Sequence, residues 1–298
     1  MNDFSGTGVA VITPFTPDRE MDTNALRRIL RHLMDGQVEY LVALGTTAES
    51  ATLSEAEQLK VLDIFFDEAG NKLPIVVGAG GNNTAKVCKW VQTVEERFAP
   101  AAFLAVCPYY NKPSQEGLYQ HFHAIASSTE KEIILYNVPG RTASNLSATT
   151  CLRLAREFPH IRAVKEASGN LEQMMEIVKG KPDHFQLLSG DDLLSLPIIS
   201  LGGRGTISVI ANAYPLPFSN MIRAALAGNW QEAKRLHYDL MKLTQLIFDE
   251  GNPTGVKFLM NQLQLCETPV RLPLVEASES LQTDIRTALQ QFPQSISV

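Results

Sequence analysis

The sequence predicts an α/β fold, a (β/α)8 TIM barrel with a C-terminal helical annex, and three observations lead to it. From the start of the chain to about residue 210, short apolar runs alternate with amphipathic helical patterns. Eight such runs occur, each followed by a helix or a gap of helix length, and barrels of this kind span about 250 residues. After roughly residue 225 the strand signal stops and only helical patterns continue.

Each predicted element has a local signal. Ser54 and Glu57 fit a capping box, in which the serine caps the helix and the glutamate reaches back to it. The predicted strands are, in chain order, Gly8–Thr13, Tyr40–Leu44, Ile75–Gly78, Ala102–Cys107, Ile133–Asn137, Ile161–Glu166, Gln186–Ser189 and Thr206–Val209. The amphipathic stretches between the strands predict helices over Asn24–Met34, Glu55–Ala69, Thr84–Phe98 and Gly117–Ser127.

A doubly wound sheet is the alternative to the barrel. Sheets that bind dinucleotides carry a Gly-x-Gly-x-x-Gly pattern after the first strand, and this chain has none there. The segment Gly78-Ala79-Gly80-Gly81 is rich in glycine, but it lacks that spacing and any Gly-Lys-Ser/Thr. The sequence therefore favours the barrel.

The domain organisation follows from the same patterns. Residues 1–224 are expected to form the catalytic barrel, and residues 225–298 a helical annex that packs on it. No linker is long enough to separate an independent domain. The annex helices are predicted at Trp230–Phe248, Pro253–Leu263 and Glu276–Gln290.

Composition restricts the class of protein. The chain has 298 residues, of which 45% are hydrophobic and 19% charged, and its net charge is −6. These values are ordinary for a soluble globular protein, and nucleic-acid binding is not expected because no basic region is present. No signal peptide and no apolar stretch of about 18 residues is found, so a cytoplasmic protein without membrane contact is expected. The cysteines are far apart and are expected to be reduced: Cys88, Cys107, Cys151 and Cys266.

Lys165 is the most informative residue, because it lies near the end of an apolar strand. Side chains alternate along a strand, so Ile161, Ala163 and Lys165 share one face. A lysine on such a face either extends to water or is held partly desolvated, and burial disfavours the ammonium form. A neutral amine attacks carbonyl groups to form a Schiff base.

The turns after the predicted strands supply the other candidates, since strand ends of a barrel converge on one pocket. Backbone N–H groups and the Thr47 hydroxyl after the second strand suit a small carboxylate, although an ordinary loop whose threonine caps a helix is the alternative. Tyr136, one βα unit before Lys165, is a candidate proton shuttle or a tyrosine that only fills the barrel mouth. Arg141 suits an acidic substrate, or is a surface arginine.

Other residues are weaker candidates. His121 and His123 point about 200° apart on a helix, so no metal is expected. Cys107 ends a strand but has no partner that would make it a nucleophile. Glu166 is expected to face the helix layer, and Lys257, in the helical annex, is a less favoured nucleophile than Lys165.

Five motifs in this order carry a resemblance that covers essentially the whole chain. They are Gly-Thr-Thr-Ala-Glu-Ser (45–50), Pro-Tyr-Tyr-Asn-Lys-Pro (108–113), Tyr-Asn-Val-Pro-Gly-Arg-Thr (136–142), Val-Lys-Glu-Ala-Ser-Gly-Asn (164–170) and Ser-Gly-Asp-Asp (189–192). The chain resembles the 4-hydroxy-tetrahydrodipicolinate synthase (dihydrodipicolinate synthase) family, within the class I pyruvate-dependent aldolase and N-acetylneuraminate lyase superfamily.

The resemblance implies a lyase of lysine and diaminopimelate biosynthesis that uses no cofactor and no metal. Its substrates would be pyruvate, bound as a Schiff base on Lys165, and L-aspartate-4-semialdehyde. It also implies a cytoplasmic homotetramer or homodimer. The implied roles are acid/base catalysis by Tyr136 with Thr46 and with Tyr110 of a neighbouring subunit, substrate binding by Thr47 and Arg141, and backbone contacts from Gly190 and Ile207.

The resemblance has alternatives and departures. Another pyruvate Schiff-base aldolase of the N-acetylneuraminate lyase type is the nearest alternative, and a keto-acid-binding barrel without catalysis or a metal-dependent aldolase are others. Thr46, where the lyases typically carry serine, and Arg141 favour the synthase. Ala48 replaces a glycine that is usual in the family. Glu55, Gln58 and Lys86 depart from the lysine-feedback site of feedback-sensitive members, so weak or absent inhibition by lysine is expected.

Overall fold

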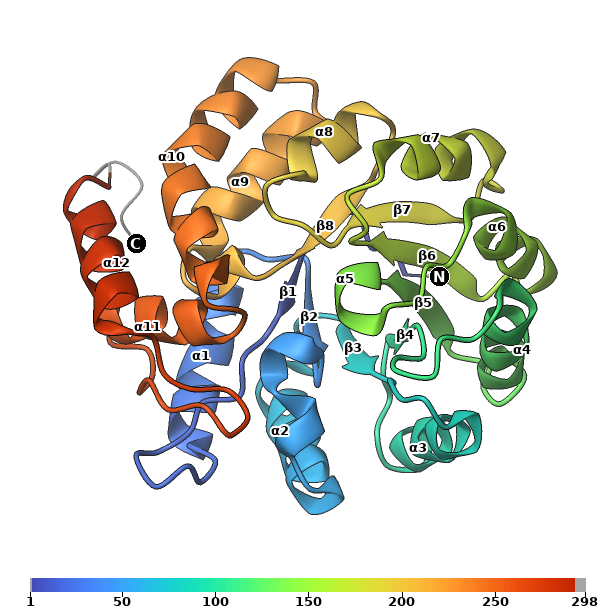
Figure 1. Cartoon of the computed structure of the whole chain (residues 1–298), viewed down its shortest axis with the longest axis horizontal. Helices are drawn as coiled ribbons and strands as arrows, with labels where there is room; N and C mark the ends of the chain where they lie inside the picture. Colours follow the sequence, from blue (N-terminus) through green and yellow to red (C-terminus); the bar gives the residue numbers. More distant parts are fainter. Residues whose placement is uncertain (1, 293–298) are drawn as a thin grey trace. The chain divides into compact units, whose positions relative to one another are not determined.

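The computed structural model describes residues 2–292, and its strands form a closed barrel in the order β1-β2-β3-β4-β5-β6-β7-β8 (Figure 1). Helices alternate with the strands, and further helices follow the last strand. The predicted fold class is therefore confirmed.

The observed strands lie within three residues of the predicted bounds. Three of the eight, β3, β6 and β7, have the predicted bounds. The largest difference is at β1, which ends at Ala10 rather than Thr13. The strands are β1 (Gly6–Ala10), β2 (Tyr40–Ala43), β3 (Ile75–Gly78), β4 (Ala102–Val106), β5 (Glu132–Asn137), β6 (Ile161–Glu166), β7 (Gln186–Ser189) and β8 (Gly205–Ser208).

The helices include five, α5 to α9, for which no bounds were predicted from the sequence. The capping box at the start of α2 is present, since the Ser54 hydroxyl accepts from Glu57 N and the Glu57 carboxylate accepts from Ser54 N. The helices are α1 (Thr23–Asp35), α2 (Glu55–Ala69), α3 (Thr84–Arg97), α4 (Gln115–Ala126), α5 (Pro139–Thr142), α6 (Ala148–Glu157), α7 (Leu171–Gly180), α8 (Ser195–Ser200), α9 (Pro215–Leu226), α10 (Trp230–Asp249), α11 (Thr254–Gln262) and α12 (Glu279–Gln290).

The predicted start of the last helix was wrong by three residues. The helix begins at Glu279 rather than Glu276, because the Ser278 hydroxyl accepts a hydrogen bond from Leu281 N and caps the first turn. Ser278 in turn donates to the Glu250 carboxylate, so a side chain from another helix end fixes where α12 begins.

Packing divides the chain into two compact units, which are described separately. Unit 1 contains residues 2–5 and 74–207, and unit 2 contains residues 6–73 and 208–292. This is a division by packing density. The division into a barrel over 1–224 and an annex over 225–298 is one of architecture, and it stays a prediction.

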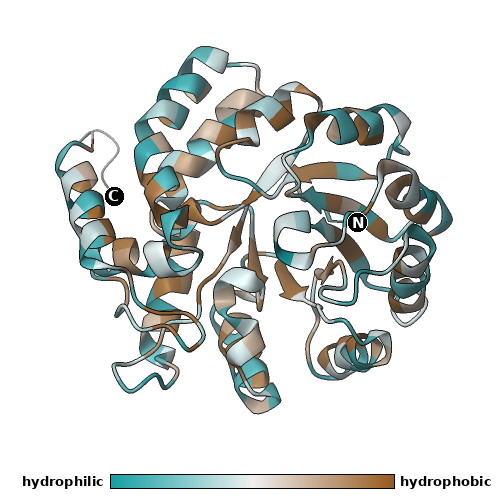
Figure 2. Cartoon of the chain, in the orientation of Figure 1, coloured by the Kyte–Doolittle hydropathy of each residue, from teal (hydrophilic) through white to brown (hydrophobic). Residues whose placement is uncertain are grey.

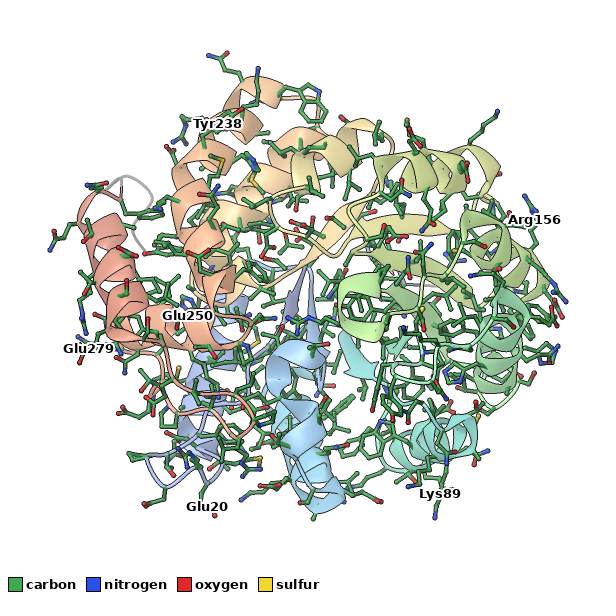
Figure 3. All side chains as sticks on the ribbon, in the orientation of Figure 1. Glu20, Lys89, Arg156, Tyr238, Glu250 and Glu279 are labelled. Carbon is green, nitrogen blue, oxygen red and sulfur yellow. The ribbon has the colours of Figure 1, made fainter. Side chains whose placement is uncertain are left out.

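Unit 1 is a parallel sheet with amphipathic helices on one side. Strands β3 to β8 pair in sequence order, and α3, α4, α6 and α7 pack as successive neighbours along them. The strands are strongly hydrophobic and the helices carry hydrophilic outer faces (Figure 2). Lys89 on α3 and Arg156 on α6 are exposed on these outer faces (Figure 3). Two-sided burial explains why the strands are nearly continuous apolar runs.

Unit 2 combines the first two strands with the C-terminal helices. Strands β1 and β2 are parallel, α1 packs against α2 and α9, and α10 packs against α9, α11 and α12. Residues 6–73, near the start of the chain, thus belong to the same unit as residues that lie about 200 positions later. No helix among residues 2–292 is long and apolar enough to cross a membrane.

Candidate active site

Lys165 and Tyr136 lie side by side at the ends of two adjacent strands in unit 1. Tyr136 is the register partner of Lys165 in the parallel pair β5–β6. Their side chains share a face, and the Lys165 Nζ lies 4.3 Å from the centroid of the Tyr136 ring. Only 5% of Lys165 and 7% of Tyr136 is exposed. The prediction that Tyr136 and Lys165 lie at the ends of neighbouring strands is confirmed.

The amine of Lys165 has no acidic side chain as a partner among residues 2–292. Among residues 2–292, Lys165 forms no ion pair, and its Nζ has no hydrogen-bond partner, in contrast to the ion-paired Lys257. No acceptor among the described residues therefore occupies the amine, which makes Lys165 the candidate nucleophile of this site.

Gly190 lies directly against Lys165. A Cβ built at Gly190 would be 3.1 Å from Lys165 Cε and 2.7 Å from Ala167 Cβ. The backbone N–H of Gly190 donates to the Glu166 carbonyl at 2.8 Å, which fixes this approach. A side chain at position 190 would push the lysine aside, so the glycine is required by space rather than by its backbone angle.

Glu166 faces the opposite side of the strand from Lys165, as predicted. It is fully buried, and its carboxylate accepts from the amides of Asn137 at 3.1 Å and of Gln173 on α7 at 2.9 Å, and from Ser168 N at 2.8 Å. Asn137 is the register partner of Glu166. This network joins the ends of β5 and β6 from the helix side and so holds Tyr136 and Lys165 in register.

Arg141 lies in α5, a single helical turn that directly follows β5 (Figure 1). The turn is closed by hydrogen bonds from Arg141 N and Thr142 N to the Val138 carbonyl, and it ends at Ala143 with φ of 55°. The Arg141 side chain is exposed. An exposed guanidinium on a hydrogen-bonded turn after the strand that carries Tyr136 is available for an anionic ligand.

Tyr110 and Ile207 contrast in their exposure. Tyr110 is 88% exposed and has a φ of 76°, in the loop between β4 and α4. The preceding Tyr109 carbonyl accepts from the Asn82 amide at 3.2 Å, which anchors the loop below it. Ile207 is buried within β8. Tyr110 therefore has no role in the packing of its own unit.

Thr46 and Thr47 belong to unit 2, in a short 3-10 turn after β2. The turn is closed by Ala48 N donating to the Gly45 carbonyl and Glu49 N donating to the Thr46 carbonyl, both at 3.1 Å. Thr46 is exposed, whereas only 2% of Thr47 is exposed. The two threonines of this turn therefore differ in their exposure to solvent.

Two residues that support this turn, Asn252 and Lys257, were not predicted as part of the site. Asn252 donates from Nδ2 to the Thr47 hydroxyl at 2.8 Å. Lys257, completely buried on α11, donates to the Glu49 carboxylate at 2.5 Å, and its Nζ lies 4.1 Å from the centroid of the Phe15 ring. Burial lowers the pKa of Lys257, and Glu49 opposes that change. A local sequence pattern cannot predict contacts between residues that lie about 200 positions apart in the chain.

The remaining candidates are not reactive groups. Burial lowers the pKa of His121 to about 4, and its Nδ1 lies 2.8 Å from the Thr84 hydroxyl. Burial, with Glu166 nearby, raises the pKa of Cys107 to about 12, so its thiol is a poor nucleophile. Within residues 2–292, no group of three His, Cys, Asp or Glu side chains has the arrangement of a metal site.

The structure brings Lys165, Tyr136 and Gly190 together. Arg141, Tyr110 and Ile207 belong to the same unit, and Thr46 and Thr47 to the other. A buried amine beside a tyrosine at adjacent strand ends is a candidate site for chemistry at a carbonyl group.

Comparisons with known proteins show which proteins this chain is similar to. The 4-hydroxy-tetrahydrodipicolinate synthase of Flavobacterium psychrophilum is 51% identical over 94% of this chain and 96% of its own length. The crystal structure of dihydrodipicolinate synthase from Aquifex aeolicus is similar with a TM-score of 0.94 and 38% identity over 99% of both chains. The chloride-inhibited enzyme from Acinetobacter baumannii, complexed with pyruvate, also has a TM-score of 0.94, with 36% identity over 99% of this chain and 100% of that one.

A family model covers nearly the whole chain. The model described as the dihydrodipicolinate synthetase family matches residues 3–292, which include both units and all of the candidate residues. With a relative 51% identical over almost its full length, the chain belongs to the dihydrodipicolinate synthetase family.

Proposed function

We propose that this chain condenses pyruvate with L-aspartate-4-semialdehyde through a Schiff base on Lys165, as a lyase of lysine and diaminopimelate biosynthesis. The pairing of Tyr136 with Lys165 at buried, adjacent strand ends carries the proposal. Relatives named 4-hydroxy-tetrahydrodipicolinate synthase support the reaction, and the pyruvate complex of the Acinetobacter baumannii enzyme supports the first substrate.

Lys165 starts the reaction as the nucleophile. Its neutral amine adds to the C2 carbonyl of pyruvate, and loss of water leaves the Schiff base. Loss of a proton from C3 gives an enamine, whose C3 forms a bond to the aldehyde carbon of the second substrate. The amino group of that substrate then attacks C2, which closes the ring and releases the lysine amine.

Tyr136 would move the protons of these steps. Its ring contacts the Lys165 amine, so a proton leaving or reaching the intermediates has a carrier at the same strand end. A phenol has an ordinary pKa near 10, and neighbouring hydroxyls make it a better shuttle. Thr46 and a Tyr110 from a neighbouring subunit are proposed to supply those hydroxyls.

The other residues would bind the substrates. Thr47 is proposed to hold the pyruvate carboxylate, and Arg141 the carboxylate of the semialdehyde, because a guanidinium binds carboxylates with two parallel hydrogen bonds. Gly190 and Ile207 would contribute backbone surface beside the lysine. No cofactor enters this mechanism.

The assembly and cellular location are also proposals. An 88% exposed tyrosine with no packing role suits donation to a second subunit, so the enzyme is proposed to be a homotetramer or homodimer. We also propose a cytoplasmic location, which biosynthesis from soluble metabolites supports.

Borohydride reduction in the presence of pyruvate, followed by peptide mass mapping, tests the proposal. We expect a pyruvate-derived adduct on Lys165, and none in the Lys165→Arg variant, whose guanidinium cannot form the Schiff base. Absence of any adduct would exclude this mechanism and leave a binding protein or a metal-dependent aldolase. Unchanged activity in a chelator would then argue against the metal-dependent enzyme.

Substrate profiling separates the synthase from other Schiff-base aldolases. The proposed enzyme consumes aspartate semialdehyde far faster than sugar-derived aldehydes. A preference for a long polyol aldehyde would instead support an enzyme of the N-acetylneuraminate lyase type.

Lysine inhibition is expected to be weak or absent. Lys86 is exposed at the start of α3, and a cation there would repel the ammonium group of a bound lysine. A submillimolar inhibition constant for L-lysine would contradict this expectation.

A further inference from the structure

Asn252 makes a single, directed contact with the turn that carries Thr47. It lies between α10 and α11, and only 6% of the residue is exposed. Its Nδ2 donates to the Thr47 hydroxyl at 2.8 Å. Its Oδ1 is buried and has no hydrogen-bond partner among residues 2–292. A buried side-chain amide whose oxygen has no hydrogen-bond partner is uncommon. In Asn252 the N–H group of that amide donates to the Thr47 hydroxyl.

The direction of this hydrogen bond sets what the threonine can do. A hydroxyl has one hydrogen to donate and lone pairs that accept. Because the Thr47 oxygen accepts from Asn252, its own hydrogen must point elsewhere, and no acceptor for it exists in the described part of the chain. The hydroxyl is therefore oriented as a donor, which is the form that binds a carboxylate.

The turn around Thr47 is held too firmly to rotate away. Glu49, two residues on, accepts from Lys257 through Oε1 and from Arg271 N through Oε2 at 2.8 Å. The Ala48 carbonyl accepts from the Thr13 hydroxyl at 2.8 Å. With its backbone fixed on both sides, the remaining freedom of Thr47 is the direction of its hydroxyl hydrogen, and Asn252 removes that freedom.

We propose that Asn252 is a positioning residue that orients the Thr47 hydroxyl as a hydrogen-bond donor to the carboxylate of the keto-acid substrate. This inference rests on the proposed function, in which Thr47 binds pyruvate. Preorganised donors bind an anion without a reorientation cost, so the effect belongs to substrate binding and appears in the KM for pyruvate.

The variant Asn252→Asp tests the direction of the hydrogen bond at nearly constant shape. An ionised carboxylate cannot donate a hydrogen bond. It would instead accept one from the Thr47 hydroxyl, which is then lost to the substrate, and its charge would also repel the substrate carboxylate. We expect the pyruvate KM at pH 8 to rise about 10- to 100-fold, as for loss of a hydrogen bond to a charged group, with a smaller change in kcat.

The pH profile distinguishes orientation from a structural role. A protonated carboxyl group donates a hydrogen bond again, and burial raises the pKa of an introduced carboxyl above its usual range. The ratio of the variant and wild-type KM values is therefore expected to fall at least about threefold from pH 8 to pH 5.5. A ratio that stays constant over this range would overturn the inference.

Two controls complete the experiment. Asn261→Asp changes a similar amide on α11 that donates to the Cys266 carbonyl rather than to the turn, and it should leave the pyruvate KM unchanged. In a Thr47→Val background, which has no hydroxyl to orient, the uncharged Asn252→Ala change should raise KM by less than about threefold beyond Thr47→Val alone. Full additivity of the two changes would contradict the proposal.

Folding and the proposed function are checked separately. If Asn252→Asp fails to fold, Asn252→Ala must still raise the pyruvate KM at least about threefold in the wild-type background and not in Thr47→Val, or the inference is wrong. Borohydride trapping with the wild-type enzyme tests the Schiff base alone. A wild-type adduct on Lys165 together with an unchanged KM in both Asn252 variants would reject the inference and keep the proposed function.

Discussion

Burial decides the reactivity of individual side chains in this protein, and the thiols show it most directly. Burial raises the pKa of Cys107 and of Cys266 to about 12, and raises that of Cys151 well above its usual range. Cys88 on α3 is partly exposed. Thiolates rather than thiols react with disulfide reagents, so the three buried thiols are protected both by protonation and by access.

Titration with a chromogenic disulfide at pH 8 checks this prediction. One of the four thiols is expected to react rapidly in the native enzyme, and all four after unfolding in guanidinium. The Cys88→Ser variant should lose the rapid phase. A second rapid phase in that variant would show that one of the buried thiols is accessible.

At the same scale, Lys165 and Lys257 show how two buried lysines acquire different roles. Lys165 lies against a tyrosine ring without a carboxylate, whereas Lys257 pairs with Glu49 and also donates to the Pro269 carbonyl. Within the described part of the chain, the first amine has no acceptor bound to it, whereas the second is held by a carboxylate and a carbonyl oxygen. The partner of each amine, rather than burial alone, separates the proposed nucleophile from the residue that holds the turn after β2.

At the scale of elements, the ion pair between Glu49 and Lys257 fastens α11 to the turn after β2. The pair is almost completely inaccessible to solvent. Removing one member of a buried pair leaves the other charge without compensation, which typically costs about 3–5 kcal/mol. Lys257→Met is therefore expected to lower the free energy of unfolding by about that amount.

Denaturant unfolding with two further variants tests the cause. Adding Glu49→Gln to Lys257→Met removes the stranded carboxylate and should recover at least about 1 kcal/mol. Lys242→Met, at an exposed position on α10, is the matched control and should change stability by less than about 0.5 kcal/mol. Equal losses for the buried and exposed lysines would contradict the assigned role.

A second connection between elements predicts a pH dependence. Arg271, hydrogen-bonded to Glu57 on α2, lowers the pKa of that carboxyl from 4.5 to about 2. Since the folded-state pKa lies below the unfolded one, the pair stabilises the protein above about pH 4.5. This contribution is lost as the pH falls towards 2.

The comparison of wild type with Glu57→Gln measures this contribution, because glutamine keeps the capping box. At pH 7 the variant is expected to be about 2 kcal/mol less stable, a figure reduced from the full shift because the pair is partly exposed. The difference should narrow below pH 4.5. Glu55→Gln, at an exposed position in the same helical turn, should show neither effect.

At the scale of the whole molecule, the exposed Tyr110 predicts that activity depends on assembly. If each subunit lends Tyr110 to its neighbour, two inactive variants can complement each other. A mixed dimer of Tyr110→Phe and Lys165→Ala contains one site with both Lys165 and the neighbour's Tyr110. Random reassociation makes about half of the dimers mixed, so about a quarter of wild-type activity is expected.

Mixing the two purified variants after partial dissociation and reassociation provides the measurement. Each variant alone should have less than a few per cent of wild-type activity, and size-exclusion chromatography reports the oligomeric state. No recovery on mixing, with reassociation demonstrated, would mean that Tyr110 acts within its own subunit or not at all.

The sequence by itself determined the barrel, its eight strands and the neighbourhood of Tyr136 and Lys165. These features are written in short-range patterns: strand-length apolar runs, helical periodicity and a lysine at a strand end. Parallel strands in sequence order place consecutive strand ends together, so the adjacency of Tyr136 and Lys165 followed without coordinates. A helix or a gap of helix length was expected after every strand, but no bounds were predicted for α5 to α9.

Only the tertiary structure decided how the turn at Thr47 is held. Asn252 and Lys257 contact that turn from more than 200 positions along the chain, and Glu166 binds Gln173 from a neighbouring helix. Such contacts depend on which side chains the packed core leaves facing each other, and no local periodicity encodes that. Local propensity therefore fixed the elements, while burial and hydrogen-bond satisfaction between distant segments fixed the orientation of the groups that the chemistry needs.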